Sequence, residues 1–288
     1  MNILRRNEIP EFLKEKIQFI KNMFKGKKIL VAFSGGIDST LVLYFAKEFG
    51  KETKGVLIHS PLIPTQEINQ AKEFSAFLKV PLMIQDVNSL LIPEIRKNLP
   101  NRCYHCKKRI LEIMNEIADE EGYDLIVDGT NYSDLKLHRP GLLALQESNV
   151  KSPLAESKFT KPDIISLTQI LALPSLNISS QACLASRIPF NMEITEDLLT
   201  KIDNAEKFIR KIIKSSTIPL RVRVHKIFPS NHLLARIESD ANLIELINNE
   251  GIREEIGSGL KKLGFTFVTI DISGFSSASM DKLVKKLN

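Results

Sequence analysis

The sequence predicts an α/β fold, a doubly wound parallel sheet followed by a smaller C-terminal α+β domain. Two observations predict the sheet. Short apolar runs typical of buried strands alternate with segments of helical periodicity, and a glycine-rich turn joins the first such run to the next helix. A third observation marks a boundary, because the pattern changes after about Pro189. We therefore expect two domains, residues 1–189 and residues 190–288.

The elements of the first domain follow one another in strand–helix order. Steps of three and four between apolar residues predict helices, and runs such as 28–33 (KILVAF) predict buried strands. The other expected strands are 55–59, 81–87 and 124–128, with a further short one near 150–154. The expected helices are one through Leu13, Ile17, Ile20 and Phe24 that ends at Gly26, then 39–49, one through Ile68, Ala71, Phe74 and Leu78, and one through Cys106, Ile110, Ile113 and Ile117.

The second domain has a different order of elements. A long amphipathic helix is expected at 195–213, followed by two alternating strands at 221–227 and 232–238. A helical stretch through Ile244, Ile247 and Leu260 leads to a strand at 265–271, and a short helix closes the chain. This order is typical of an α+β domain.

Composition narrows the function classes. The chain has 288 residues, 43% hydrophobic and 26% charged, which suits a packed core. The net charge of +6 is spread along the chain, which suits an anionic small molecule and does not require nucleic acid, although solvated lysine-rich helix faces explain most of this charge as well. We find no apolar run long enough to span a membrane and no signal-peptide pattern, so we expect a cytoplasmic protein. The count of three cysteines argues against a disulfide framework.

The strongest motif is a phosphate loop after the first strand. Glycines let the backbone approach a phosphate closely, and the helix that follows presents unpaired N–H groups to an anion. The alternative is an ordinary glycine-rich turn between a strand and a helix. The motif lacks the lysine of the G-x-x-x-x-G-K-[ST] nucleotide loop. The residues that we expect to bind a phosphate group are Ala32, Phe33, Ser34, Gly35, Gly36, Asp38, Ser39 and Thr40.

A second polar turn, 128–131 (DGTN), ends the strand at 124–128 and should reach the same edge of the sheet. Asp128 and Asn131 are candidates to bind ATP, and Asp128 could hold Mg²⁺, which prefers oxygen ligands. A turn in which these side chains make only local hydrogen bonds explains the motif equally well.

The three cysteines suggest a metal centre. Cys103 and Cys106 form a C-x-x-C pair, Cys183 lies far along the chain, and basic residues that favour thiolates flank both places. Three thiolates are the count for a [4Fe–4S] cluster with one open iron. A zinc site completed by His105, a redox pair and unrelated buried cysteines are the alternatives.

Taken together, these motifs resemble known families. The 34–40 loop is similar to the S-G-G-x-D-S signature of the PP-loop ATP pyrophosphatases, which cleave ATP to AMP and pyrophosphate. This resemblance implies that ATP is the ligand of the loop residues 32–36 and 38–40 and that Asp38 is also catalytic. The whole chain resembles the LarE family, the sulfur transferases that build the nickel-pincer nucleotide of lactate racemase. The resemblance is carried by SGGIDST at 34–40, NRCYHCK at 101–107, DGTN at 128–131, HRPG at 138–141, SPLAE at 152–156, ACLASRIP at 182–189, RVRVH at 221–225 and ARIE at 235–238.

The resemblance implies a substrate and a sulfur source. The substrate is a pyridinium dicarboxylate mononucleotide whose carboxylates become thiocarboxylates after adenylation by ATP. Some members of the family sacrifice the cysteine that matches Cys183, whereas others hold a [4Fe–4S] cluster with three cysteines that match Cys103, Cys106 and Cys183. The pattern of this chain favours the cluster. Family members assemble as oligomers, so we expect a homo-oligomer.

Arginines are the candidates for binding an anionic ligand. Arg221 and Arg223 alternate on one strand and leave its same face, with Glu238 on the neighbouring strand to orient them, although an edge strand with surface charges would look alike. Arg187 lies four residues after Cys183 and is a candidate anion contact near the chemistry. The segment 274–280 (GFSSASM) departs from the G-Y-R-x-G-S-M expected of the family, which puts an anion contact there in doubt.

Three other functions compete with this interpretation. A tRNA thiolation enzyme should show additional zinc-ribbon cysteines or a concentrated basic surface, which this sequence lacks. A PP-loop amidotransferase or ligase that uses ammonia would not need the cysteines. A non-catalytic metal-binding or nucleotide-binding protein would form no AMP with any acid.

Overall fold

The computed structural model describes residues 8–136, 140–174, 182–215 and 218–276. The chain forms two compact units, which are not continuous in sequence. The first unit comprises Met1–Ser60, Thr65–Val87 and Cys103–Ser180, and the second comprises Pro61–Pro64, Asn88–Arg102 and Gln181–Asn288. The second unit thus contains two internal segments of the predicted first domain as well as the C-terminal part.

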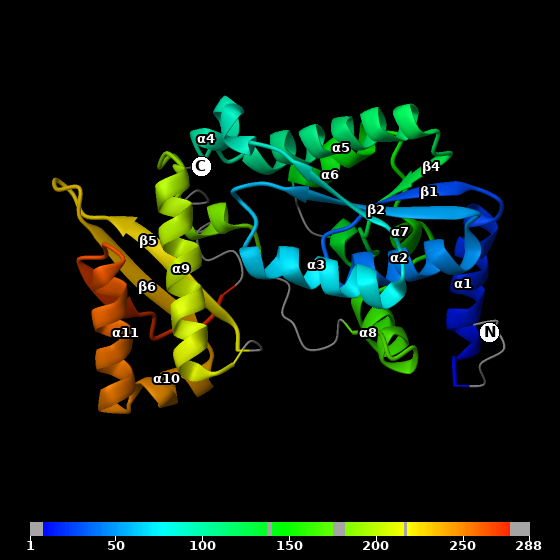
Figure 1. Ribbon diagram of the computed structural model, residues 1–288. Helices are drawn as coiled ribbons and strands as arrows, with labels where there is room; N and C mark the ends of the chain where they lie inside the picture. Colours follow the sequence, from blue (N-terminus) through cyan, green and yellow to red (C-terminus); the bar gives the residue numbers. More distant parts are fainter. Residues whose placement is uncertain (1–7, 137–139, 175–181, 216–217, 277–288) are drawn as a thin grey trace. The chain divides into compact units, whose positions relative to one another are not determined.

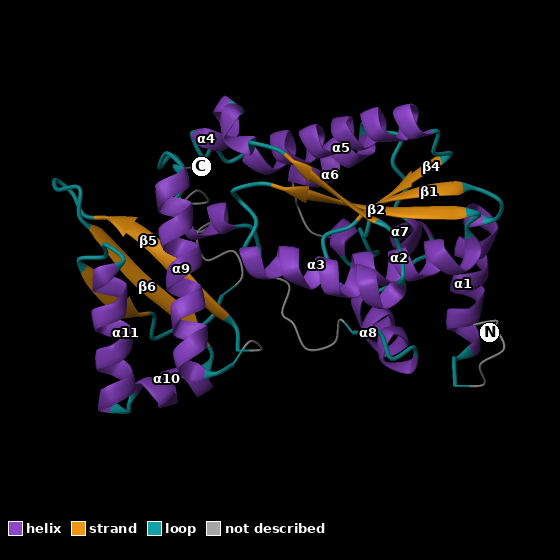
Figure 2. Cartoon of the chain, in the orientation of Figure 1, coloured by secondary structure: helices purple, strands orange, loops and turns teal. Residues whose placement is uncertain are grey.

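The first unit is built on a parallel sheet. Its strands are β1 (Lys28–Ala32), β2 (Glu52–His59), β3 (Leu82–Asp86) and β4 (Leu125–Val127), in the order β3-β2-β1-β4. Helices α2 (Ile37–Phe49) and α3 (Thr65–Leu78) cover one face, and α5 (Arg102–Glu121) and α6 (Pro140–Gln146) cover the other (Figures 1 and 2). This arrangement confirms the predicted doubly wound sheet. The connections change direction between β1 and β4, and such sheets bind ligands at the carboxyl ends of strands beside this point.

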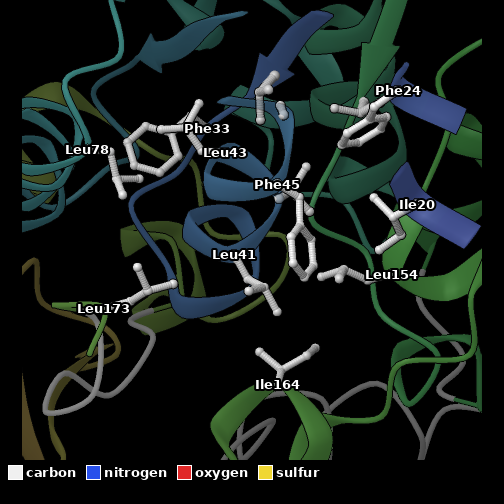
Figure 3. Close-up of a cluster of buried hydrophobic side chains, with 14 of the residues drawn as sticks. Ile20, Phe24, Phe33, Leu41, Leu43, Phe45, Leu78, Leu154, Ile164 and Leu173 are labelled. Carbon is white, nitrogen blue, oxygen red and sulfur yellow. The ribbon is translucent and has the colours of Figure 1, made fainter. Parts of the chain in front are cut away.

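Successive side chains of each strand point to opposite faces of the sheet, so the apolar ones are divided between two cores. Val31 and Leu57 point into the larger core, and their neighbours Leu30 and Val56 point into the other. Helix α1 (Glu11–Phe24) adds its buried stripe to the larger core. Figure 3 shows this core, in which Ile20, Phe24, Phe33, Leu41, Leu43, Phe45, Leu78, Leu154, Ile164 and Leu173 are labelled.

One predicted strand is wrong, and the helices after residue 136 in this unit were not predicted. The expected strand at 150–154 is reduced to a single bridge between Val127 and Lys151, because Pro153 begins a short helix, α7 (Pro153–Glu156). Helix α8 (Lys161–Ile170) follows, and its first turn is closed by a capping box between Thr160 and Asp163. A short 3₁₀ turn, η3 (Asp134–Lys136), precedes α6.

The second unit carries a three-stranded sheet. Its strands are β5 (Leu220–Lys226), β6 (Leu233–Ser239) and β7 (Phe267–Ile270), with β5 and β6 antiparallel and β6 and β7 parallel. Strand β7 is shorter than the predicted 265–271. The helical elements are η2 (Ser89–Leu91), α4 (Pro93–Arg96), η4 (Leu184–Arg187), α9 (Glu196–Ile213), α10 (Ala241–Ile247) and α11 (Glu250–Lys262).

The strand alternation of this second sheet separates apolar from charged side chains. Val222, Val224, Ala235 and Ile237 point to one face, and the arginines of β5 point to the other. The closing helix predicted at the C-terminus lies outside the described residues. No helix in the described ranges combines the length and apolar character that crossing a membrane requires.

Candidate functional site

The phosphate loop leaves β1 through a turn that only glycine accommodates. Gly35 has φ +74°, and a Cβ there would lie 3.0 Å from the backbone N and Cα of Ala71 on α3. The buried amide of Gln70 donates to the Gly35 carbonyl at 2.9 Å, which fixes the turn against α3. Position 35 therefore requires glycine for two reasons: its backbone conformation disfavours other residues, and helix α3 lies too close to leave room for a Cβ.

The hydroxyl groups of the loop hold its shape. Ser39 Oγ and Thr40 Oγ1 donate to the Gly36 carbonyl at 3.0 and 2.9 Å, and Ser34 Oγ lies 3.2 Å from Ser39 Oγ. Gly36 is the N-cap of α2 and makes no side-chain capping bond, so the first-turn amides of α2 remain the donors best suited to an anion. Phe33 lies in the apolar core and can contribute to the loop only through its backbone.

Asp38 of the loop is paired with a lysine that the sequence did not single out. Lys161 Nζ, from the first turn of α8, donates to both carboxylate oxygens of Asp38 at 2.8 and 2.7 Å. Burial raises the pKa of Asp38 above its ordinary value, although the hydrogen bonds and charge of Lys161 and the amide of Asn131 lower it in part. A carboxylate and an ammonium group thus meet at the loop.

Asp128 is fully engaged in the turn after β4. It is 2% exposed, and it accepts hydrogen bonds from Lys107 Nζ at 2.8 Å, Ser152 Oγ at 2.7 Å, and Thr130 Oγ1 and N at 2.7 and 3.1 Å. Burial opposes ionisation, but Lys107 and the hydroxyl donors outweigh it and hold the pKa of Asp128 below its ordinary value. Each carboxylate oxygen already accepts two bonds, so the geometry fits a turn better than a Mg²⁺ ligand.

This turn lies directly against the phosphate loop. A Cβ on Gly129 would lie 2.8 Å from the Ser39 amide nitrogen, so the backbone of the turn is packed on the start of α2. Asn131 is 3% exposed and accepts from the Ser133 and Asp134 amides at 2.8 and 3.2 Å, an Asx turn. The structure therefore brings the two polar motifs together, as their places at adjacent strand ends predict.

The cysteine pair lies on the first turns of α5. Cys103 is exposed and Cys106 is half-buried, three residues apart on one helix, so both sulfurs leave neighbouring positions. Lys107, the residue after the pair, is the partner of Asp128. Helix α5 is therefore tied at this point to the turn that packs on the phosphate loop.

Cys183 belongs to the second unit, where it is half-buried. Three thiols are suitable donors for iron, and two of them form the pair on α5. Among the residues that the structure describes, however, no three His, Cys, Asp or Glu side chains are gathered closely enough to hold a metal ion. The donor chemistry fits a cluster, and the described geometry supplies only the pair.

Arg187 clamps the segment that carries Cys183. Its guanidinium is completely buried and pairs with both carboxylate oxygens of Glu206, on α9, at 2.9 and 3.0 Å. It also donates to the carbonyls of Ala182 and Cys183, the latter at 3.2 Å. The sequence suggested an anion contact for Arg187, whereas here its donors are engaged by the protein itself. Arg187 is a positioning residue for Cys183.

The two arginines of β5 differ in their partners. Arg223 is 1% exposed and donates to Glu238 Oε2 at 2.9 and 2.8 Å and to the Ser186 carbonyl. Arg221 lies 4.7 Å from the ring centroid of Phe275 and makes no ion pair among the described residues. Burial and the charges of Arg187 and Arg223 lower the pKa of Arg221 to about 10. Arg221 is thus the arginine of this face best suited to an anionic ligand.

The divergent C-terminal segment covers these arginines. Phe275 stacks on Arg221, and the Ser276 carbonyl accepts from Arg223 Nη2 at 3.2 Å. Residues 277–280 of the divergent segment, and His138 and Arg139 of the HRPG motif, lie outside the described residues. The segment therefore contacts the arginine pair by ring and backbone, with no arginine of its own.

Sequence reasoning missed Lys161, Lys107 and Glu206. The signal for Lys161 was present, since Thr160 and Asp163 form a capping box just before an apolar helical run. Lys107 was noted only as one of the charges beside the cysteines. Glu206 lies on the buried face of α9, where a charged residue indicates a buried partner.

Comparisons with known proteins identify one family model and several relatives that are similar over most of their length. A family model described as queuosine biosynthesis protein QueC matches residues 28–132. An uncharacterized protein of Methanocaldococcus jannaschii is 38% identical over 274 residues, covering 92% of this chain and 99% of its own. An uncharacterized protein of Synechocystis is 30% identical, covering 95% of this chain and 100% of its own. The pyridinium-3,5-bisthiocarboxylic acid mononucleotide synthase of Lactiplantibacillus plantarum is 32% identical over 264 residues, covering 90% of this chain and 91% of its own.

Proposed function

Because this chain belongs to the LarE family, the family of the pyridinium-3,5-bisthiocarboxylic acid mononucleotide synthase, we propose that it converts a carboxylate of a pyridinium dicarboxylate mononucleotide to a thiocarboxylate at the expense of ATP. It is an ATP-dependent sulfurtransferase. The observation that carries the proposal is the phosphate loop at the carboxyl edge of the sheet, with Asp38 and Lys161 paired beside it.

The reaction has two balanced steps. A carboxylate oxygen of the substrate attacks the α-phosphorus of ATP, the bond to the bridging β-phosphate oxygen breaks, and pyrophosphate leaves. A sulfur nucleophile then attacks the carbonyl carbon of the acyl adenylate, and the bond to the AMP oxygen breaks. One carboxylate oxygen therefore leaves in AMP, and one sulfur replaces it.

The chain's own groups favour the first step at the loop. The first-turn amides of α2 bind the pyrophosphate oxygens, and Lys161 brings a positive charge to the same loop, where negative charge develops on the leaving group. Mg²⁺ enters bound to the phosphates of ATP, and no step here requires Asp128 as its ligand.

For the sulfur, we propose that Cys103, Cys106 and Cys183 hold a [4Fe–4S] cluster. When bound, such a cluster supplies an open iron that carries an additional sulfide. The residues around the cysteines do the positioning: Lys107 ties the pair to the turn beside the phosphate loop, and Arg187 holds the carbonyls around Cys183. The catalytic residues of the proposal are Asp38, Cys103, Cys106 and Cys183.

The second unit binds the anionic part of the substrate in this proposal. Arg221, stacked on Phe275, supplies an arginine without an acidic partner among the described residues, and Arg223 and Glu238 hold the sheet face around it. A phosphate of the mononucleotide suits such a guanidinium. Homo-oligomeric assembly and a cytoplasmic location belong to the proposal as well.

The loop is tested by AMP formation. Lys161→Met should lower AMP release with the mononucleotide and ATP by roughly 10²- to 10³-fold, the usual cost of removing one charge-stabilising contact. Asp38→Asn should lower it by a similar factor, because the Asp38 carboxylate holds the Lys161 ammonium group at the loop. Lys16→Met is the matched control, because it breaks a 2.8 Å ion pair to Asp163 in the first turn of the same helix and leaves Asp38 untouched. An Asp38→Asn variant that forms AMP at the normal rate would remove the loop from the mechanism.

The cluster is tested by metal analysis of anaerobically prepared protein. Iron and acid-labile sulfide should be bound, with broad visible absorption that Cys103→Ala abolishes while ATP still binds. Zinc alone would exclude the cluster and leave the two-step reaction with another sulfur source.

The rival functions have separate signatures. Steep salt-dependent binding of tRNA would favour tRNA thiolation. Activity that survives substitution of all three cysteines, with ammonia as the nucleophile, would favour an amidotransferase or ligase.

A further inference from the structure

Arg102 is a buried arginine, and two of its three guanidinium nitrogen atoms have no hydrogen-bond partner. The residue is 7% exposed, and its Nε and Nη1 atoms have no hydrogen-bond partner. No ion pair joins it to an acidic side chain in the described part of the chain. A buried charge without a counter-charge is strongly unfavourable, and buried arginines are ordinarily paired. Arg102 therefore lacks a partner that its surroundings require.

The guanidinium is nevertheless held in a fixed place. It lies 4.4 Å from the centroid of the Phe190 ring, a cation–π contact. The two segments that carry these residues are joined by Asn98, whose Nδ2 donates to the carbonyls of Ile188 and Pro189 at 3.2 and 2.7 Å and whose carbonyl accepts from the Asn191 amide at 3.0 Å. Arg102 is thus positioned before any ligand arrives.

The geometry limits what the partner can be. A guanidinium offers its N–H donors in its own plane along two edges, Nε with Nη2 and Nη1 with Nη2, and an oxyanion with two oxygens matches either edge. Asn98 is completely buried, and its Oδ1 is another unpartnered polar atom of the same segment. Arg102 is also the first residue of α5, where the positive end of the helix dipole favours an anion.

We propose that Arg102, stacked on Phe190, is a carboxylate-binding site, and that it receives the carboxylate of the substrate that is not being activated. The identity of that carboxylate rests on the proposed function. The site lies within the second unit, on the residue immediately before Cys103. A pyridinium dicarboxylate has two such groups, so a site that holds one of them leaves the other free to be activated.

The test measures the binding of pyridine-3,5-dicarboxylate to the full-length protein in the absence of ATP, with ligand-observed NMR as the readout. The wild type should bind the diacid, and Arg102→Met should bind it about 10- to 100-fold more weakly, the usual effect of losing a charge-assisted bidentate contact. Arg102→Lys keeps the charge and loses the planar fork, so it should lie between the two. Arg109→Met is the matched control, since Arg109 is on the same helix and pairs with Glu112 and Glu116 at the surface.

Several outcomes would overturn the assignment. Diacid binding by Arg102→Met at wild-type strength, or failure of the wild type to bind it, excludes the site. Inorganic phosphate that binds more tightly than the diacid, with loss in Arg102→Met, would assign Arg102 to a phosphate instead. Should Arg102→Met fail to fold, Phe190→Leu decides, because it removes the stacking surface and keeps the charge; unchanged binding there contradicts the proposal. Because no ATP is present, loss of turnover cannot imitate these results.

Discussion

Replacing Arg187 by methionine should destabilise the second unit severely and loosen the segment around Cys183. The guanidinium is completely buried, Glu206 is 3% exposed, and the pair makes two bonds of 2.9 and 3.0 Å. Removing one partner of a buried pair leaves the other charge uncompensated, which costs about 3–5 kcal/mol. At about 2–4 °C per kcal/mol for a chain of this size, Tm should fall by roughly 6–20 °C.

A double variant separates the charge from the packing. Arg187→Met with Glu206→Gln removes the orphaned charge, while the new side-chain amide keeps an acceptor for the Val222 backbone N–H, which lies 3.0 Å from Glu206 Oε1. The double variant should therefore recover about half of the lost free energy of unfolding. Thermal unfolding and urea titration measure the stability, and the alkylation rate of Cys183 in a Cys103→Ala/Cys106→Ala background measures how firmly its segment is held. A loss below about 1 kcal/mol in Arg187→Met, with an unchanged alkylation rate, would refute the positioning role.

Two further predictions concern stability. Gly259→Ala on α11 would place its Cβ against the Phe208 ring of α9, so the free energy of unfolding should fall by about 1–3 kcal/mol through overpacking. Gly257→Ala on the same helix meets nothing within 4 Å, so it should raise the free energy of unfolding by up to about 1 kcal/mol, measured by urea unfolding. Equal effects of the two variants would contradict the packing of α11 on α9. The depressed pKa of Asp128 means that its carboxylate contributes stability above its unfolded pKa of about 3.9, and that this contribution is lost as pH falls through the lower folded pKa. Asp128→Asn should therefore be less stable at neutral pH and show a flatter decline in stability below about pH 4, and an unchanged acid profile would exclude the ion pair with Lys107.

The sequence was sufficient for the elements whose periodicity is long and uninterrupted. Helix α1, the four strands of the parallel sheet and the long helix α9 follow their apolar patterns, and the phosphate loop lies where a strand, two glycines and a helix place it. The region from 130 to 174 was harder to interpret, because short elements separated by prolines carry too few turns for a period. Lys161 lies in that region, which is why it was missed.

Side-chain partners were harder to predict than positions. Arg187 is a basic residue close to Cys183 in the sequence, as expected of a residue that binds an anionic ligand. Its partner in the structure is instead Glu206, 19 positions later in α9. Asp128 likewise looks like a metal ligand until Lys107, Thr130 and Ser152 are seen around it. Such partners come from distant elements, and a pattern within one element carries no information about them.

The measurement that tests the central claim most directly follows AMP and the mass of the mononucleotide together, with anaerobic protein, ATP and the pyridinium dicarboxylate mononucleotide. The proposed function predicts that one carboxylate oxygen is replaced by sulfur for each AMP formed, and that Asp38→Asn lowers both to the same extent. Formation of AMP with an unaltered acid, or with an amide in place of the thiocarboxylate, would contradict it.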